Sequence, residues 1–138
     1  MFSFFTSREN YYKKANFENM QYAIQHSSEF IIINTLLFQE QHCLILGTID
    51  AYSEEKVINE MIHSIDIPDK RIIIYGKNCN DDSPYIKYKQ LRNLGISDIM
   101  IYSGGFFEWL LLQDIYGIKA FPTTSKNIDI LKYKPSII

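Results

Sequence analysis

The sequence predicts an α/β domain built on a parallel sheet, and three observations indicate this fold class. Short unbroken apolar runs, such as Ile72 to Tyr75, are typical of strands buried on both faces. Between these runs lie segments whose apolar residues recur at helical spacing, several of them preceded by Ser, Asp or Asn. Strands that alternate with helices form βαβ units, and the right-handed crossovers of such units make the sheet parallel.

Length and composition indicate one folded domain. The 138 residues are 46% hydrophobic and 14% aromatic, which suffices for one sizeable core. The formal charge of -2 provides no basic field, so nucleic acid is not expected as a partner. The sequence has no apolar run long enough to span a membrane and no signal-peptide pattern, so we expect a cytoplasmic protein without membrane association. In that reducing compartment, Cys43 and Cys79 are expected to be free thiols.

In the N-terminal half, the predicted elements follow one another closely. Residues 1–15 show no clean periodicity and are assigned to a leader of uncertain order. Apolar spacing predicts a helix over residues 17–24, and an unbroken apolar run predicts a strand over residues 30–33. A short apolar piece over residues 43–49 follows, broken by a glycine. Ser53 is the predicted N-cap of the next helix.

In the C-terminal half, the alternation continues. The central strand over residues 72–75 is followed by a helix over residues 83–93 and another apolar strand over residues 99–102. After a Gly-Gly turn, residues 106–112 are expected to form a helix that is apolar on most faces and therefore buried. Residues 118–138 are assigned to a tail that packs on the domain or trails from it.

The polar loop that joins the central strand to the next helix is the candidate functional site. In open α/β sheets, ligands and nucleophiles lie where a strand ends and a helix begins, because helix N-termini favour negative charge. This loop contains a cysteine, which makes Cys79 the candidate catalytic residue. The other loop residues considered part of the site are Gly76, Lys77, Asn78, Asn80, Asp81, Asp82 and Ser83.

The ordered set of these segments resembles a single rhodanese domain. The marks are the first core strand from Phe30 to Asn34, the segment from Leu44 to Ile49, and the central strand that runs into the loop. The clearest mark is Tyr102 to Trp109, which is similar to the Gly-Gly-x-x-x-Trp pattern of that family. The resemblance covers roughly residues 17–117 and places the domain at residues 16–117.

This resemblance implies a three-layer sandwich, with a mostly parallel five-stranded sheet and helices on both faces. Members of the family transfer sulfane sulfur through a persulfide on the loop cysteine, or bind partners as catalytically silent copies. No cofactor is expected. His26, His42 and His63 lie far apart in the sequence, so no metal site is expected either.

Three departures from the family pattern indicate a degenerate site. The nucleophile of the family directly follows the central strand, where this chain has Gly76. The charged Asp-x-Arg after the first strand is replaced by residues 34–36, Asn-Thr-Leu. In the stretch of the type His-Ile-Pro-Gly-Ala, Leu44 and Leu46 replace the histidine and the proline. Each departure removes a group that supports the site in the family.

Two interpretations of Cys79 are open. Backbone N–H groups of the loop and the helix start would lower the thiol pKa, and Lys77 would add positive charge. Alternatively, Cys79 is incidental, and the nearby carboxylates of Asp81 and Asp82 would raise the thiol pKa.

The leading functional hypothesis is a non-catalytic or degenerate rhodanese-like protein that binds a protein partner or a small sulfur-containing ligand at the loop. The alternative is a sulfurtransferase that forms a persulfide on Cys79 from thiosulfate or another sulfane-sulfur donor. A third hypothesis is a structural protein that forms oligomers through the aromatic residues of the leader, 1–15.

Overall fold

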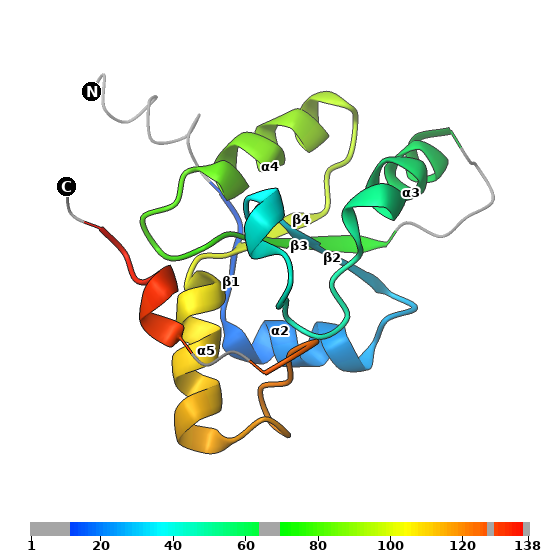
Figure 1. The fold of residues 1–138 in the computed structure, drawn as a ribbon. Helices are drawn as coiled ribbons and strands as arrows, with labels where there is room; N and C mark the ends of the chain where they lie inside the picture. The colour runs from blue at the N-terminus through cyan, green and yellow to red at the C-terminus, as the bar shows by residue number, and fades with distance from the viewer. Residues whose placement is uncertain (1–11, 64–69, 127–128, 137–138) are drawn as a thin grey trace, which may run out of the picture.

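A parallel sheet forms the centre of the structure, a computed structural model that describes residues 12–63, 70–126 and 129–136. The sheet has the strand order β1-β4-β3-β2, and all neighbouring strands are parallel. Its strands are β1 (Lys14–Ala15), β2 (Phe30–Asn34), β3 (Arg71–Tyr75) and β4 (Ile99–Tyr102) (Figure 1). The central β3 pairs with a neighbour on each side, as expected for its unbroken apolar run.

Among the described residues, the sheet contains four strands rather than the five that the family resemblance implies. The fifth strand is reduced to one parallel bridge, between Ile32 and Thr48, and to a hydrogen bond from the Ile49 N–H to the Ile32 carbonyl at 2.9 Å. Gly47 has a φ of +91°, a conformation that ends an extended segment. The chain therefore turns immediately before the bridge, and no longer ladder forms.

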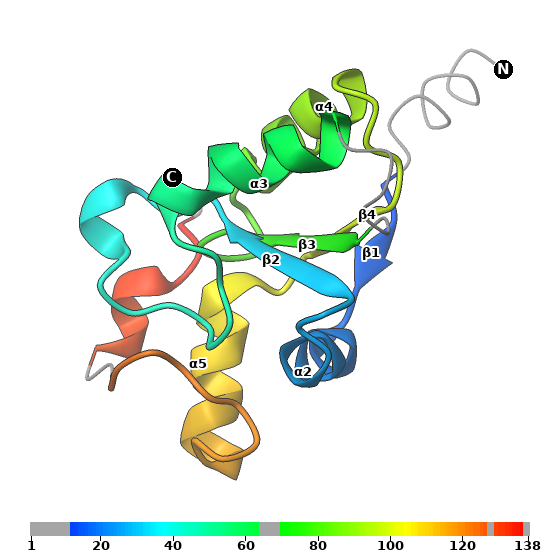
Figure 2. The same cartoon turned by 90° about the vertical axis from the view of Figure 1, so that its right-hand side faces the viewer.

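Helices cover both faces of the sheet, which confirms the three-layer arrangement. The helices α3 (Ala51–His63) and α4 (Ser83–Asn93) lie on one face, and α2 (Phe17–Gln25) and α5 (Gly105–Tyr116) lie on the other (Figure 2). No helix in the described part of the chain combines the length and the apolar character needed to cross a bilayer.

Alternate residues of β3 contribute to two separate cores. Ile72 and Ile74 pack with the apolar faces of α3 and α4, whereas Ile73 and Tyr75 pack with α2 and α5. All four are fully buried. Burial of each such side chain stabilises the fold by about 1.5–3 kcal/mol, so this strand ties both cores to one element.

The start of α3 corrects one sequence-based prediction. The helix begins at Ala51, two residues before Ser53, so Ser53 is not its N-cap. Instead, the Asp50 carboxylate accepts hydrogen bonds from both the N–H and the hydroxyl of Ser53, each at 3.0 Å. An aspartate before the first turn is an equally good cap, and two candidates this close cannot be separated by propensity alone.

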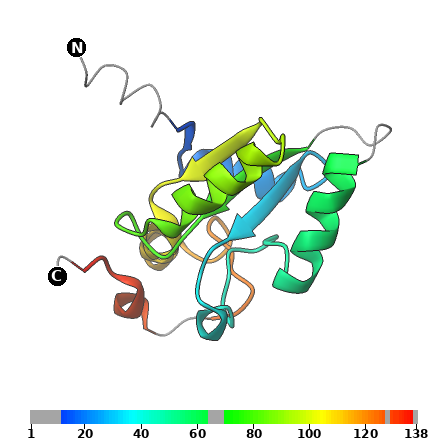
Figure 3. The ribbon, with the colours of Figure 1, turned by 90° about the horizontal axis from the view of Figure 1, so that it is seen from above.

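The two ends of the chain join the fold in different ways. Of the leader, residues 1–11 lie outside the described residues, and Lys14 and Ala15 form the edge strand β1. At the other end, residues 129–136 form a segment that we call the C-terminal strap. Its 3₁₀ turn η2 (Ile130–Tyr133) packs on α5, with the buried Tyr133 ring edge-on to Phe106 at 4.9 Å. Figure 3 shows the strap at the same end of the molecule as the loop that precedes α4.

Candidate functional site

The loop between β3 and α4 is fastened to the N-terminus of α5. The N–H groups of Phe106 and Phe107 donate to the carbonyls of Gly76 and Lys77, both at 2.9 Å. Gly105 has a φ of +72°, and a Cβ there would lie 2.9 Å from the backbone of Asn78. Glycine at 105 therefore permits both the left-handed turn and the close approach of the two backbones.

The Asp81 carboxylate occupies the interior of the loop. Its Oδ2 accepts a hydrogen bond from the Lys77 N–H at 2.8 Å. Its Oδ1 accepts from the Ser83 N–H at 2.9 Å and from the Ser83 hydroxyl at 2.8 Å. The side chain of Asp82, the residue that directly precedes α4, makes no capping hydrogen bond. Asp81 therefore takes over the role of anchoring the start of α4.

The position of Gly76 depends on having no side chain. A Cβ added there would lie 2.5 Å from Oδ2 of Asp81 and 2.7 Å from Cγ of Pro84. Both distances are well inside van der Waals contact. A thiol-bearing side chain at position 76 would thus begin where the Asp81 carboxylate now lies.

Cys79, the predicted catalytic residue, lies on the outer side of the loop. Its side chain is exposed, and its Sγ lies 3.9 Å from Oδ1 of the neighbouring Asn80. Four of the loop N–H groups that were expected to stabilise a thiolate donate to other acceptors. In addition to the two that donate to Asp81, the Asn80 N–H donates to Oδ1 of Asn78 at 2.9 Å, and the Asp81 N–H donates to the Asn78 carbonyl at 3.2 Å.

The ammonium group of Lys77 is likewise engaged outside the loop interior. Its Nζ lies 2.9 Å from Oε2 of Glu40, whose side chain is 9% exposed. Glu40 belongs to the short 3₁₀ turn η1 (Phe38–Glu40), and it also accepts from the Leu37 N–H at 3.3 Å. Sequence reasoning missed Glu40, because nothing in the local pattern indicates that residues 37 positions apart form an ion pair.

The C-terminal strap crosses the outer side of the loop. The Asn78 side-chain amide donates to the Tyr133 carbonyl at 2.9 Å, and that of Asn80 donates to the Ser136 carbonyl at 3.4 Å. Cys79, which lies between these two asparagines, nevertheless stays exposed. The strap therefore stabilises the loop without covering the thiol.

Tyr75, the last residue of β3, connects the end of the sheet to residues 45–48. The Tyr75 hydroxyl accepts from the Ile45 N–H at 3.1 Å and is hydrogen-bonded to the Thr48 hydroxyl at 2.8 Å. Complete burial raises the pKa of Tyr75 well above its usual value, so its hydroxyl stays neutral. Tyr75 therefore holds residues 45–48 against the end of the sheet as a structural group.

The departures from the family pattern have structural consequences of their own. Oδ1 of Asn34 accepts from the Leu36 N–H at 3.0 Å, which closes a local turn at the end of β2. The hydroxyls of Thr35 and Ser83 are hydrogen-bonded at 2.7 Å, which joins this turn to the start of α4. The residues that replace the charged pair thus serve the packing of the loop.

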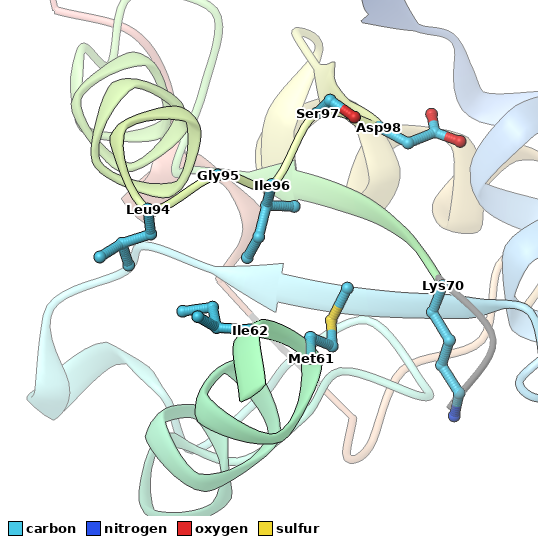
Figure 4. A pocket seen from close by; sticks show the side chains of 8 residues that line it. All are labelled: Met61, Ile62, Lys70, Leu94, Gly95, Ile96, Ser97 and Asp98. Carbon is cyan, nitrogen blue, oxygen red and sulfur yellow. The ribbon is translucent and has the colours of Figure 1, made fainter. Parts of the chain in front are cut away.

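A separate cavity lies at the opposite end of the sheet. It has a volume of about 270 Å³ and is formed by the last turn of α3, the residue before β3 and the connection from α4 to β4 (Figure 4). Its acidic group, Asp98, is already within ion-pair distance of Lys13 and Arg71, at 3.6 and 3.2 Å. Among residues 12–63, 70–126 and 129–136, no cluster of three or more His, Cys, Asp or Glu side chains could hold a metal ion. The lining residues are Met61, Ile62, Lys70, Leu94, Gly95, Ile96, Ser97 and Asp98.

No family model and no curated protein matches this sequence. Solved structures do match over most of the chain. A full-length protein from Lactobacillus plantarum superposes with a TM-score of 0.58 at 13% identity, and covers 91% of this chain and 96% of its own. The single-domain sulfurtransferase RDL2 of Saccharomyces cerevisiae gives 0.54 at 16% identity, covering 77% of this chain and 94% of its own. The rhodanese-like domain of the Alr3790 protein from Anabaena sp. gives 0.53 at 19% identity, with coverages of 91% and 86%.

The chain has a rhodanese-like fold. This confirms, for the fold alone, the resemblance drawn from the sequence. Identities this low do not allow the roles of individual residues to be transferred between the proteins. In this rhodanese-like domain, the loop after β3 occupies the expected place, but Gly76 stands directly after the strand and Asp81 fills the interior.

Proposed function

We propose that this rhodanese-like domain is catalytically degenerate and that it binds a protein partner through the outer surface of the loop. The observation that carries the proposal is the combination at the centre of the loop: Gly76 supplies no thiol, and the Asp81 carboxylate takes up the donors and the space beside it. A persulfide needs a thiolate with stabilising donors around it. The interior holds no cysteine, and its donors from Lys77 and Ser83 already bind Asp81.

The part of the outer surface that the C-terminal strap leaves exposed is available to a partner. Cys79, Asn80 and Asp82 are exposed, and the loop that bears them is fixed from two sides, by α5 and by the strap. Groups that are already ordered lose little conformational entropy on binding, which favours recognition. The small sulfur-containing ligand that the family also suggests is the less favoured occupant, because the interior is filled. The proposal includes the cytoplasmic location that the sequence predicts, a reducing compartment in which Cys43 and Cys79 stay free thiols.

A sulfurtransferase that uses Cys79 is the second candidate, and one observation favours it. The thiol is exposed, so a donor such as thiosulfate can reach it. In that reaction, the Cys79 thiolate attacks the outer sulfur of thiosulfate, an S–S bond forms to the protein, and sulfite leaves with the electron pair of the broken S–S bond. The persulfide would then be passed to an acceptor thiol.

The two candidates are separated by intact mass after incubation with thiosulfate in the absence of reductant. We compare the wild type with Cys79→Ser and with Cys43→Ser, whose thiol is buried. The proposal predicts no gain in any of the three. A gain of about 32 Da, one sulfur atom, that is lost only in Cys79→Ser would overturn the proposal and establish the sulfurtransferase chemistry.

Partner binding is tested directly by crosslinking from the loop. A photoreactive amino acid at position 80 or 82 should crosslink the same protein in cells, whereas one at Lys56, on the exposed side of α3, should not. Identical crosslinking patterns from all three positions would refute a partner site at the loop.

A further inference from the structure

The hydrogen-bond donors inside the loop converge on one carboxylate of the chain itself. Two backbone N–H groups, those of Lys77 and Ser83, and the Ser83 hydroxyl all donate to Asp81, at 2.8 to 2.9 Å. Such donors at the start of a helix commonly hold a phosphate or another small anion. Here the carboxylate of Asp81, an anion that belongs to the chain itself, accepts the hydrogen bonds of all three donors.

A second observation, which is steric, concerns the space above the end of β3, where the Asp81 carboxylate also lies. Oδ2 of Asp81 lies 2.5 Å from the position of a Cβ on Gly76, at the point where the chain leaves the sheet. An anion bound directly above the end of β3 would have to occupy this volume. Asp81 therefore excludes other anions both by space and by like-charge repulsion.

The surrounding charges do not offset this repulsion. The Lys77 ammonium points away to Glu40 and lies 2.9 Å from its carboxylate. Asp82, the next acidic residue, is exposed and adds negative charge near the helix start. The Ser83 hydroxyl is also hydrogen-bonded to the Thr35 hydroxyl at 2.7 Å, which connects the donors around Asp81 to the end of β2.

We infer that Asp81 is the specificity-determining residue of the loop: it acts as a built-in anion that closes the interior to thiosulfate, sulfate and phosphate. Recognition is thereby restricted to the outer surface of the loop. This inference rests on the proposed function, because it explains which class of ligand the same site rejects.

The test compares anion binding by four forms of the full chain. Asp81→Ala removes the carboxylate and leaves the three donors of Lys77 and Ser83 without it, whereas Asp82→Ala removes the same charge one residue away and leaves these donors bound to Asp81. Asp81→Asn keeps the shape of the side chain without its charge. Thiosulfate is the probe, with sodium chloride at matched ionic strength as the reference, and binding is followed by NMR shifts of the Lys77 and Ser83 amides.

The wild type, Asp82→Ala and Asp81→Asn are expected to show no saturable shift of these two amides. Asp81→Ala is expected to show one, with an affinity at least about tenfold higher than the wild type, and a rise in melting temperature as the anion binds the folded state. Asp81→Ser, whose smaller side chain also leaves room, replaces the alanine variant if that variant does not fold.

Two results would overturn the inference. One is saturable thiosulfate binding at Lys77 and Ser83 in the wild type, which requires no variant. The other is a folded Asp81→Ala or Asp81→Ser protein that binds no more tightly than the wild type. Neither result would by itself disprove the proposed function. Failure of the proposed function would appear as a gain of one sulfur atom on Cys79 in the intact-mass measurement.

Discussion

Replacing Gly76 by alanine should destabilise the protein, although the substitution adds one methyl group. The added Cβ would lie 2.5 Å from Oδ2 of Asp81, 2.7 Å from Cγ of Pro84 and 2.9 Å from its Cδ. Normal contacts for these atom pairs are longer, so at least one of the two side chains must move. The ring of Pro84 belongs to the first turn of α4, which makes Asp81 the easier side chain to displace.

The magnitude follows from what the displaced carboxylate leaves behind. The N–H groups of Lys77 and Ser83 would lose their acceptor, at about 1–3 kcal/mol for each donor that stays buried, and partial access of water to both reduces this cost. If Asp81 stays in place, overpacking against it and Pro84 costs about 1–3 kcal/mol. Because the cheaper of these two responses sets the cost, we expect Gly76→Ala to lower the free energy of unfolding by about 1–3 kcal/mol.

The assay is urea unfolding followed by the fluorescence of Trp109, the single tryptophan of the chain, which is fully buried. A double-mutant cycle with Asp81→Ala is the control. In that background, Gly76→Ala should cost at least about 1 kcal/mol less, with a remainder from Pro84. The reasoning is refuted if Gly76→Ala costs less than about 0.5 kcal/mol, or the same amount in both backgrounds.

Three further predictions concern the surroundings of the loop. Lys77→Met should lower the free energy of unfolding by about 1–3 kcal/mol in urea unfolding, because it leaves the nearly buried Glu40 carboxylate without its ion-pair partner. As the control, Lys13→Met at an exposed ion pair should cost less than about 0.5 kcal/mol. Equal costs of the two substitutions would contradict this prediction. Burial raises the pKa of Tyr75 and of Tyr102 in the folded state, so the unfolded tyrosines ionise first and each should lower the stability by about 1.4 kcal/mol per pH unit above about pH 10. In pH-dependent urea unfolding, Tyr75→Phe should reduce the total slope by this amount, and an unchanged slope would argue against it. Asn78→Ala should loosen the C-terminal strap, which the buried Tyr133 still anchors on α5, and should speed its cleavage in limited proteolysis at a global cost of about 1 kcal/mol. Unchanged cleavage would show that the hydrogen bond to the strap is dispensable.

The elements that were predictable from the sequence are those defined by local pattern. The unbroken run from Ile72 to Tyr75 predicted a central strand, and β3 is fully buried beyond its first residue. The helix over residues 83–93 was placed at its actual bounds, because a proline at its start and a glycine after its end limit it on both sides. The Gly-Gly turn and its tryptophan correctly indicated the helix α5, but only one face of this helix is buried. Phe106, Trp109 and Leu110 lie in the core, whereas Leu111 is 39% exposed.

The fifth strand shows where the family pattern misled the prediction. The segment around Ile45 and Thr48 has the apolar composition of a strand, but Gly47 adopts a left-handed conformation, and only one bridge forms. Composition cannot reveal this, since glycine tolerates both extended and left-handed backbone equally well. The choice is made by tertiary contacts, among them the hydrogen bonds of residues 45 and 48 to the Tyr75 hydroxyl.

The sequence by itself determined that the chain forms an α/β sheet domain and that no thiol follows the central strand, because both depend on residue identity and short-range periodicity. Only the tertiary structure decided how the loop is used. Asp81 points inward because the glycine at position 76 leaves room for its carboxylate and because Lys77 and Ser83 present donors there. The ion pair with Glu40 and the hydrogen bonds to the C-terminal strap join residues far apart in the sequence, and no local pattern encodes such contacts.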